Sequence, residues 1–229
     1  MPLEQHPLDP SELPIFSSIM EEAFASGIGP LLYPDPSKYT QESREHTYAM
    51  NHKAMQNNPD TIRFFKIIDT SLDASTHRHA GIVAVSEWKI FPNSRSEEEL
   101  AAEEAEAATS GLPPGMDPKF AEAFFGQLAV HKRKNLGGKP FMLLHILAVA
   151  PDQHRKGVGK TAMWWGVEEA DRRDLPLYLE SSPAGKGLYE RFGFGTVSWL
   201  DFDAREFGAE TALAHACMLR PKRSERGVE

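Results

Sequence analysis

The chain has 229 residues, of which 33 are acidic and 25 are basic, so its formal net charge is −8. Hydrophobic residues make up 41% and charged residues 25%, which is typical of a globular protein with a full core. A single cysteine, Cys217, excludes an internal disulfide and favours a reducing compartment such as the cytoplasm. No apolar run approaches the roughly 20 residues of a membrane span, and the N-terminus lacks a signal-peptide layout. The negative charge also disfavours nucleic-acid binding.

The first 90 residues predict two helices and a hairpin. Residues 1–10 contain three prolines and favour an extended segment with a short edge strand. A helix is expected from residue 11 up to Gly27, followed by a loop over 27–36 that is rich in glycine and proline. Thr40 is a candidate cap for a second helix that ends before Pro59. The β-rich runs at 62–68 and 80–90 predict a hairpin.

The composition changes abruptly between residues 91 and 118. Six of the 33 acidic residues lie in 97–106, which contains no lysine or arginine, and the remainder of the chain has 27 acidic and 25 basic residues. Most of the negative charge therefore belongs to a low-complexity insertion, expected as a solvated helix or a disordered lobe. Apolar residues at helical spacing, Phe120, Phe124 and Leu128, predict an amphipathic helix over about 118–133.

The second half of the chain is more regular. Residues 141–150 form an apolar run between two prolines and predict a buried strand, followed by a polar turn at 152–159 and a helix to about 171. A strand at 176–180, a helix at 185–192 and strands at 196–202 and 212–219 come next, and the charged tail from 221 is expected to fray. Such strand–turn–helix–strand units predict an α/β (α+β) fold with a mixed sheet flanked by helices.

The turn after residue 150 has the features of an anion site. It places Arg155, Lys156, Gly157, Gly159 and Lys160 between a buried strand and a helix N-terminus. Glycines let backbone N–H groups approach a ligand, and the helix end adds partial positive charge, so phosphate or pyrophosphate is the expected ligand. A tight βα turn with no ligand is the alternative.

A nucleotide-binding P-loop is a poorer explanation of this turn. Gly159, Lys160 and Thr161 match the end of that motif, but His154 stands where its first glycine is required.

The segment 143–194 strongly resembles the GCN5-related N-acetyltransferase (GNAT) family over three blocks in order. The first block is the strand Leu147-Ala148-Val149. The second is the turn 154–159 (HRKGVG), which corresponds to the family signature Q/R-x-x-G-x-G/A, and the third is the closing block 188–194 (LYERFGF). His154 departs from the Gln or Arg of the family. The resemblance implies a mostly antiparallel sheet in which two parallel central strands splay apart, with helices on both faces.

The resemblance also implies acetyl-CoA as the co-substrate. In this family the cofactor arm pairs with the first splayed strand and the pyrophosphate lies on the turn, while Ser182 stands where the family often has Asn. The implied cofactor-binding residues are Leu147, Ala148, Val149, His154, Arg155, Lys156, Gly157, Val158, Gly159, Lys160 and Ser182.

Two residues are candidates for proton transfer. Tyr189 matches the family tyrosine that acts as general acid on the leaving thiolate, with packing on the sheet as the alternative. His145, expected on the same strand face as Leu143 and Leu147, is a candidate general base or a core histidine. Glu87 and Glu180 are further carboxylate candidates for which a structural role is favoured. The histidines lack metal-ligand spacing, so no metal is expected.

The predicted function is acetyl transfer from acetyl-CoA to a small-molecule amine by direct attack in a ternary complex, because no activated Cys or Ser is evident. The alternative is a catalytically silent CoA-binding module with a regulatory or interaction role. Residues 1–229 are expected to form one acetyltransferase domain with an inserted acidic segment and helix at about 91–133. No nucleic-acid or membrane partner is expected, and monomer and homodimer remain open.

Overall fold

One mixed sheet organises the chain in the computed structural model, which describes residues 2–109, 111–212 and 214–227. Its seven strands lie in the order β1-β2-β3-β4-β5-β7-β6, and every neighbouring pair is antiparallel except β4 with β5. The strands are β1 (Leu3–Pro7), β2 (Ile62–Asp69), β3 (Ile82–Phe91), β4 (Phe141–Val149), β5 (Leu177–Ser181), β6 (Gly195–Trp199) and β7 (Ala216–Arg220). The predicted sheet is thereby confirmed, including its mostly antiparallel pairing.

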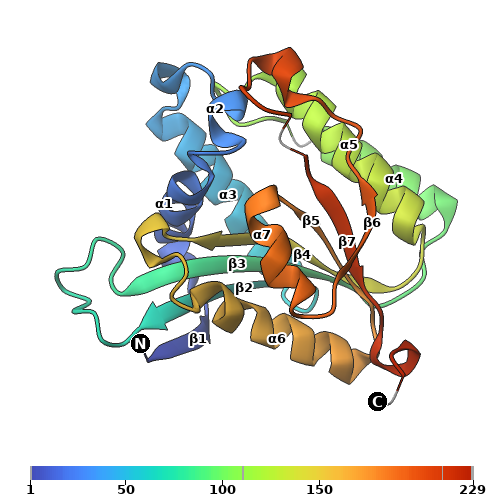
Figure 1. The fold of residues 1–229 in the computed structure, drawn as a ribbon. Coiled ribbons are helices and arrows are strands. Elements are labelled where there is room, and N and C mark those ends of the chain that lie inside the picture. Colours follow the sequence, from blue (N-terminus) through green and yellow to red (C-terminus); the bar gives the residue numbers. More distant parts are fainter. Residues whose placement is uncertain (1, 110, 213, 228–229) are drawn as a thin grey trace.

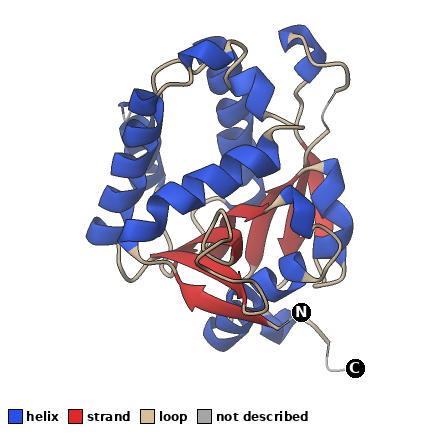
Figure 2. Ribbon diagram, turned by 90° about the vertical axis from the view of Figure 1, so that its left-hand side faces the viewer, coloured by secondary structure: helices blue, strands red, loops and turns tan. Residues whose placement is uncertain are grey.

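Helices cover both faces of this sheet (Figures 1 and 2). They are α1 (Leu13–Phe24), α2 (Gly29–Leu32), α3 (Gln41–Asn57), α4 (Glu97–Thr109), α5 (Pro118–Leu136), α6 (Val158–Arg173) and α7 (Pro183–Glu190). Helix α6 packs on β3 and β4 from one side, where Trp88, Met163 and Leu177 are fully buried in one apolar cluster. None of the described helices is long and apolar enough to span a membrane.

The opposite face carries two separate apolar clusters. The first contains Phe16 and Ile19 of α1 packed on Phe64 and Val85, with α3 at its margin. The second lies under α5, where Phe120 and Phe124 pack with Leu143. The part of the sheet surface between these two clusters therefore carries polar side chains.

The segment between β3 and β4 is folded rather than disordered. Arg133 of α5 forms ion pairs with Glu97 and Glu104 of α4. The segment that joins the two helices reaches the other side of the molecule, where the Ser43 hydroxyl donates to the Pro114 carbonyl at 2.6 Å and the Asp117 N–H donates to the Leu32 carbonyl at 2.7 Å. The expectation of a helix here is correct, and that of a disordered lobe is wrong for the described residues.

Three further sequence expectations need correction. The loop predicted at 27–36 contains the short helix α2, which packs in the same apolar cluster as α5. The tail does not fray over its described residues, because Arg226 pairs with Asp171 and the Ser224 hydroxyl donates to Asp174 at 2.7 Å. The last strand, expected at 212–219, begins only at Ala216.

Gly166 sets how closely α6 approaches the sheet. A Cβ at this position would lie 2.1 Å from Cη2 of the buried Trp88 ring. We expect Gly166→Ala to lower the free energy of unfolding by about 1–2 kcal/mol, because overpacking outweighs the gain of roughly 1 kcal/mol in helix propensity. Urea denaturation measures this change.

Gly126→Ala is the matched control, because a Cβ at this exposed position of α5 would meet nothing within 4 Å. It should raise the free energy of unfolding by up to about 1 kcal/mol. Equal stabilisation by both substitutions would show that α6 does not press on Trp88.

Candidate active site

The two parallel strands at the centre of the sheet separate soon after they meet. β4 and β5 pair only through Met142 with Leu177 and Leu143 with Tyr178. Beyond these residues β4 continues to Val149 and pairs with β3 alone. The edge of β4 that faces β5 therefore keeps unpaired backbone groups available to another extended chain.

A β-bulge lies where the strands separate. Glu87 is paired with Ile146, whereas the next residue, Trp88, is paired with Leu144, so His145 is the extra residue on β4. The bulge interrupts the alternation of faces, and Leu143 and Leu147 pack in different clusters on opposite faces. His145 shares the face of Leu143 as expected, but the expectation that Leu147 lies on that face is wrong for this reason.

The bulge brings His145 to a polar cluster on the face opposite α6, formed by Glu87, Lys89, Lys132, His145 and Glu180. Nε2 of His145 lies 4.0 Å from the buried Glu87 carboxylate, which also binds Nζ of Lys89 at 3.3 Å. Lys132 comes from α5 and interacts electrostatically with Glu180 and His145. Sequence reasoning missed Lys132 because α5 was assigned to an insertion outside the shared core, and it also missed Lys89, which lies on the predicted strand β3.

Burial changes the proton affinities within this polar cluster. Desolvation raises the pKa of Glu180 to about 7, although the charge of Lys132 opposes the shift. The pKa of His145 lies below its usual value because of desolvation, with smaller contributions from Lys89 and Lys132, while Glu87 acts in the opposite direction. At neutral pH the lowered pKa favours the unprotonated imidazole, whose side chain is still 44% exposed, and Glu180 lies near the midpoint of its titration.

Tyr189 lies on the other face of the sheet. Its ring packs edge-on to Phe194 with 6.0 Å between centroids, in the same cluster as Leu144 and Leu179. Burial raises its pKa well above the usual value of a phenol, so the hydroxyl keeps its proton at neutral pH. Tyr189 and the polar cluster thus approach the gap between β4 and β5 from opposite faces.

The turn after β4 has the backbone of an anion site. Arg155 and Gly157 both have positive φ angles, of 61° and 85°, and this conformation directs backbone N–H groups to one side. Gly157 caps α6, and no side chain satisfies the first N–H groups of that helix. A Cβ on Gly157 would meet nothing within 4 Å, so the space above the turn is open.

The side chains of the turn contribute unequally. Nε2 of His154 donates to the Val149 carbonyl at 3.1 Å, so its imidazole braces the turn against the end of β4. Lys156 donates to Gln153 at 3.2 Å, and Nζ of Lys160 lies 5.9 Å from the Trp164 ring centroid. Val158 is buried, whereas Arg155 and Ser182 are exposed. Gly159 lies close to α7, because its Cβ would be 3.0 Å from Cδ2 of Leu188.

The described residues contain no group of three or more His, Cys, Asp or Glu side chains arranged to hold a metal ion.

Comparison with known proteins agrees with this geometry. Residues 84–194 match the model of the acetyltransferase (GNAT) family. A stretch of 44 residues is 34% identical to the probable acyltransferase SID5 of Ajellomyces capsulatus, and it covers 19% of this chain and 32% of that protein. The match therefore spans about a third of the curated relative.

Solved structures share the fold over nearly the whole chain. A mosquito arylalkylamine N-acetyltransferase like 5b is 14% identical with a TM-score of 0.63, covering 96% of this chain and 99% of that one. The structure titled histone acetyltransferase HPA2 and related acetyltransferase, from Corynebacterium glutamicum, is 17% identical with a TM-score of 0.57 and 97% coverage of both chains. The resemblance to the GNAT acetyltransferase family is thus confirmed over residues 84–194, and the solved structures share the fold of this chain.

The polar cluster predicts opposite effects of two substitutions on the pKa of His145. Glu87→Gln removes the negative neighbour that favours the imidazolium and should lower this pKa further. Lys132→Met removes a positive neighbour and should raise it. An NMR titration of the imidazole measures both shifts. Lys134→Met, on an exposed position of the same helix, is the control and should leave the pKa in place; identical titrations in all variants would contradict the cluster.

Proposed function

We propose that this protein is an acetyl-CoA-dependent N-acetyltransferase that acts on the amine of a small molecule by direct attack in a ternary complex. The observation that carries the proposal is the separation of β4 from β5 next to an uncapped, positively charged helix N-terminus. A thioester cofactor needs both parts, a slot for its extended arm and an anion site for its pyrophosphate.

The cofactor would lie between the two strands and on the turn. Backbone groups of Leu147, Ala148 and Val149 would pair with the arm, and residues 154–160 would hold the pyrophosphate. His154 would act by bracing the turn, because its imidazole is engaged by Val149. Ser182 begins α7 without capping it through its side chain, which leaves the hydroxyl available to the arm.

Acetyl transfer needs a base for the amine and a proton donor for the leaving thiolate. His145 is unprotonated at neutral pH and would accept the proton of the amine from the polar-cluster face. Glu180 is a second candidate base, because a pKa of about 7 matches the operating pH better than the lowered pKa of His145.

Tyr189 would donate to the thiolate from the other face. Its raised pKa opposes donation, but the same burial also raises the proton affinity of a thiolate placed beside it. Attack and proton donation would thus come from opposite faces of one gap.

The names of solved structures with this fold point to different acceptors. The mosquito structure is titled an arylalkylamine N-acetyltransferase, whereas an Escherichia coli structure with a TM-score of 0.51 and 15% identity is titled a ribosomal-protein-S18-alanine N-acetyltransferase. Two contacts support a small acceptor here. Pro114 of the inserted segment accepts from Ser43 of α3, and Asp117 donates to Leu32 of α2. The inserted segment therefore connects the two sides of the polar face. A single domain with an insertion at about 91–133, a cytoplasmic location, and monomer or homodimer assembly remain predictions.

A catalytically silent CoA-binding module is the second candidate, and it would retain the turn without needing the polar cluster. Calorimetry with acetyl-CoA, followed by thiol release with a panel of amines, separates the two. Binding followed by thiol release supports the enzyme. Binding without release on any amine supports the module, and absence of binding contradicts both.

The turn gives a prediction for cofactor affinity. Gly157→Val should abolish CoA binding because a β-branched residue does not adopt a φ of 85° without strain. Gly159→Asp should do the same, because its Cβ presses on Leu188 and its charge repels the pyrophosphate. Calorimetry with CoA measures both. Gly195→Asp, on β6 with nothing within 4 Å of its Cβ, is the control and should bind CoA normally.

The two catalytic candidates predict different kinetic defects. Tyr189→Phe should lower kcat by about a hundredfold while CoA affinity stays near that of the wild type. His145→Ala should remove the ascending limb of the rate-versus-pH curve if His145 is the base, whereas Glu180→Gln should do so if Glu180 is the base. Full turnover by Tyr189→Phe would exclude the tyrosine as proton donor.

A further inference from the structure

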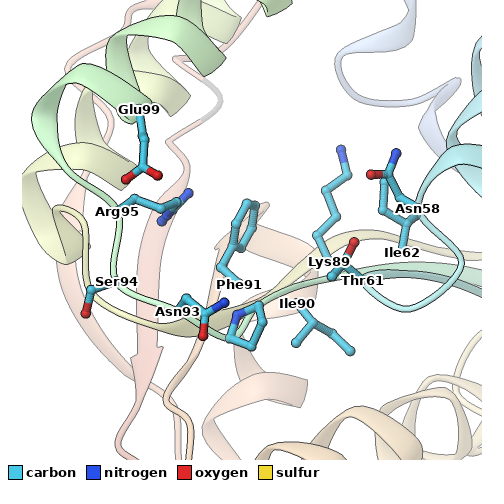
Figure 3. A pocket seen from close by; sticks show the side chains of 11 residues that line it. Asn58, Thr61, Ile62, Lys89, Ile90, Phe91, Asn93, Ser94, Arg95 and Glu99 are labelled. Carbon is cyan, nitrogen blue, oxygen red and sulfur yellow. The ribbon is translucent and has the colours of Figure 1, made fainter.

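A recess of about 400 Å³ opens at the far end of β3. It lies between the C-terminal end of α3 and the segment that leads into α4, and its lining includes Asn58, Lys89, Phe91, Arg95 and Glu99 (Figure 3). The volume suits a small organic molecule.

The recess is separate from the cofactor turn. In the ladder between β3 and β4, Ala84 is paired with Val149 at one end and Phe91 with Phe141 at the other. The turn follows Val149, whereas the recess surrounds Phe91, so the two lie at opposite ends of the ladder. A ligand in this recess is therefore not the pyrophosphate.

The recess and the polar cluster share one residue, Lys89. Glu87, Lys89 and Phe91 alternate along β3 and so point to the same face of the sheet. Nζ of Lys89 contacts the Glu87 carboxylate at 3.3 Å and also lines the recess. A molecule whose amine reaches Glu87 and His145 would extend past Lys89 into this space.

Two cations flank the Phe91 ring in the recess (Figure 3). The Arg95 guanidinium stacks 4.3 Å from the Phe91 ring centroid and donates to Glu103 at 2.9 Å, which fixes its position. Its buried Nε has no hydrogen-bond partner within the described residues. Glu99, the acidic residue of the lining, is already engaged, since the Ser96 N–H donates to its carboxylate at 2.7 Å. Glu99 also interacts electrostatically with Arg95, so the lining holds two cations and one carboxylate and keeps a net positive charge.

We propose that this recess binds a carboxylate of the acceptor, held by Lys89 and Arg95, while the amine reacts at the polar cluster. The proposal rests on the proposed function and names its substrate class as ω-amino acids. Arg95 stacks on Phe91, two same-face positions along β3 from Glu87, and successive such positions are about 7 Å apart, so an amine at Glu87 and a carboxylate at Arg95 would be separated by roughly 7–13 Å. Several bonds are needed to span this distance, which excludes a simple α-amino acid that reacts at its α-amine.

Matched amines test the proposal in the full-length protein with acetyl-CoA. ε-Aminocaproate is compared with pentylamine, and glycine with methylamine, so that each pair differs only in the carboxylate. For the long pair kcat/KM should be higher with the carboxylate by about tenfold or more, because a charge-assisted hydrogen bond is gained. For the short pair a much smaller advantage is expected, because glycine is too short to reach Arg95 beside Phe91.

Lys89→Gln should bring the ratio within the long pair close to one. Lys89 could also affect the reaction through its contact with Glu87. That effect would be the same for both amines of a pair, so it cancels in the ratio of their kcat/KM values. Lys53→Gln, at an exposed position of α3, is the control and should keep the wild-type ratio.

A wild-type ratio near one for the long pair, or a ratio that Lys89→Gln leaves unchanged, would overturn the proposal. If acetyl-CoA binds but no amine releases thiol, the proposed acetyltransferase function is wrong, but the carboxylate site can still be tested. Calorimetry then compares the affinities of ε-aminocaproate and pentylamine for the CoA-loaded protein, and equal affinities would overturn the proposal of a carboxylate site.

Discussion

The early divergence of β4 from β5 is the constraint on which the rest of the site depends. Two paired residues on each strand hold the sheet together, and every later residue of β4 leaves its backbone open on that side. If β4 and β5 stayed paired, the gap between them would be closed, and the two faces of the sheet would not be connected there. The bulge at His145 occurs at this divergence and turns one more side chain toward the polar face. Slot and polar cluster therefore arise from one local irregularity.

The divergence is tolerated because the surrounding packing fixes both strands. β4 remains paired with β3 along its length, and β5 remains paired with β7 over all five of its residues. Beneath the gap, α6 holds Trp88 and Leu177 in a single buried cluster. A gap in a sheet is costly unless its backbone groups find partners, so an arrangement of this kind is favoured where a ligand supplies them.

The segment between β3 and β4 changes the chemistry of the open face. Glu97, Glu103 and Glu104 of α4 pair with Arg95 and Arg133 and remain at the surface, whereas α5 places Lys132 near Glu180 and His145. The net charge of −8 therefore says little about the site, whose nearest charges include Lys89, Lys132 and Arg95. Local charge, and not the charge of the whole chain, sets the electrostatics of this face.

The sequence by itself determined the order of elements, the GNAT turn and the tyrosine block, because glycine positions, caps and apolar periodicity are local properties. Thr40, for example, caps α3 as expected, and β2 and β3 form the expected hairpin. Only the tertiary structure decided that Leu147 leaves the face of Leu143 and His145, since a bulge depends on the register with β3 and breaks the alternation that a sequence predicts. The tertiary structure also places Lys132 near Glu180, although nearly fifty residues separate them in the sequence. Contacts between distant segments, and the loss of hydration that shifts pKa values, depend on packing that no single stretch of sequence contains.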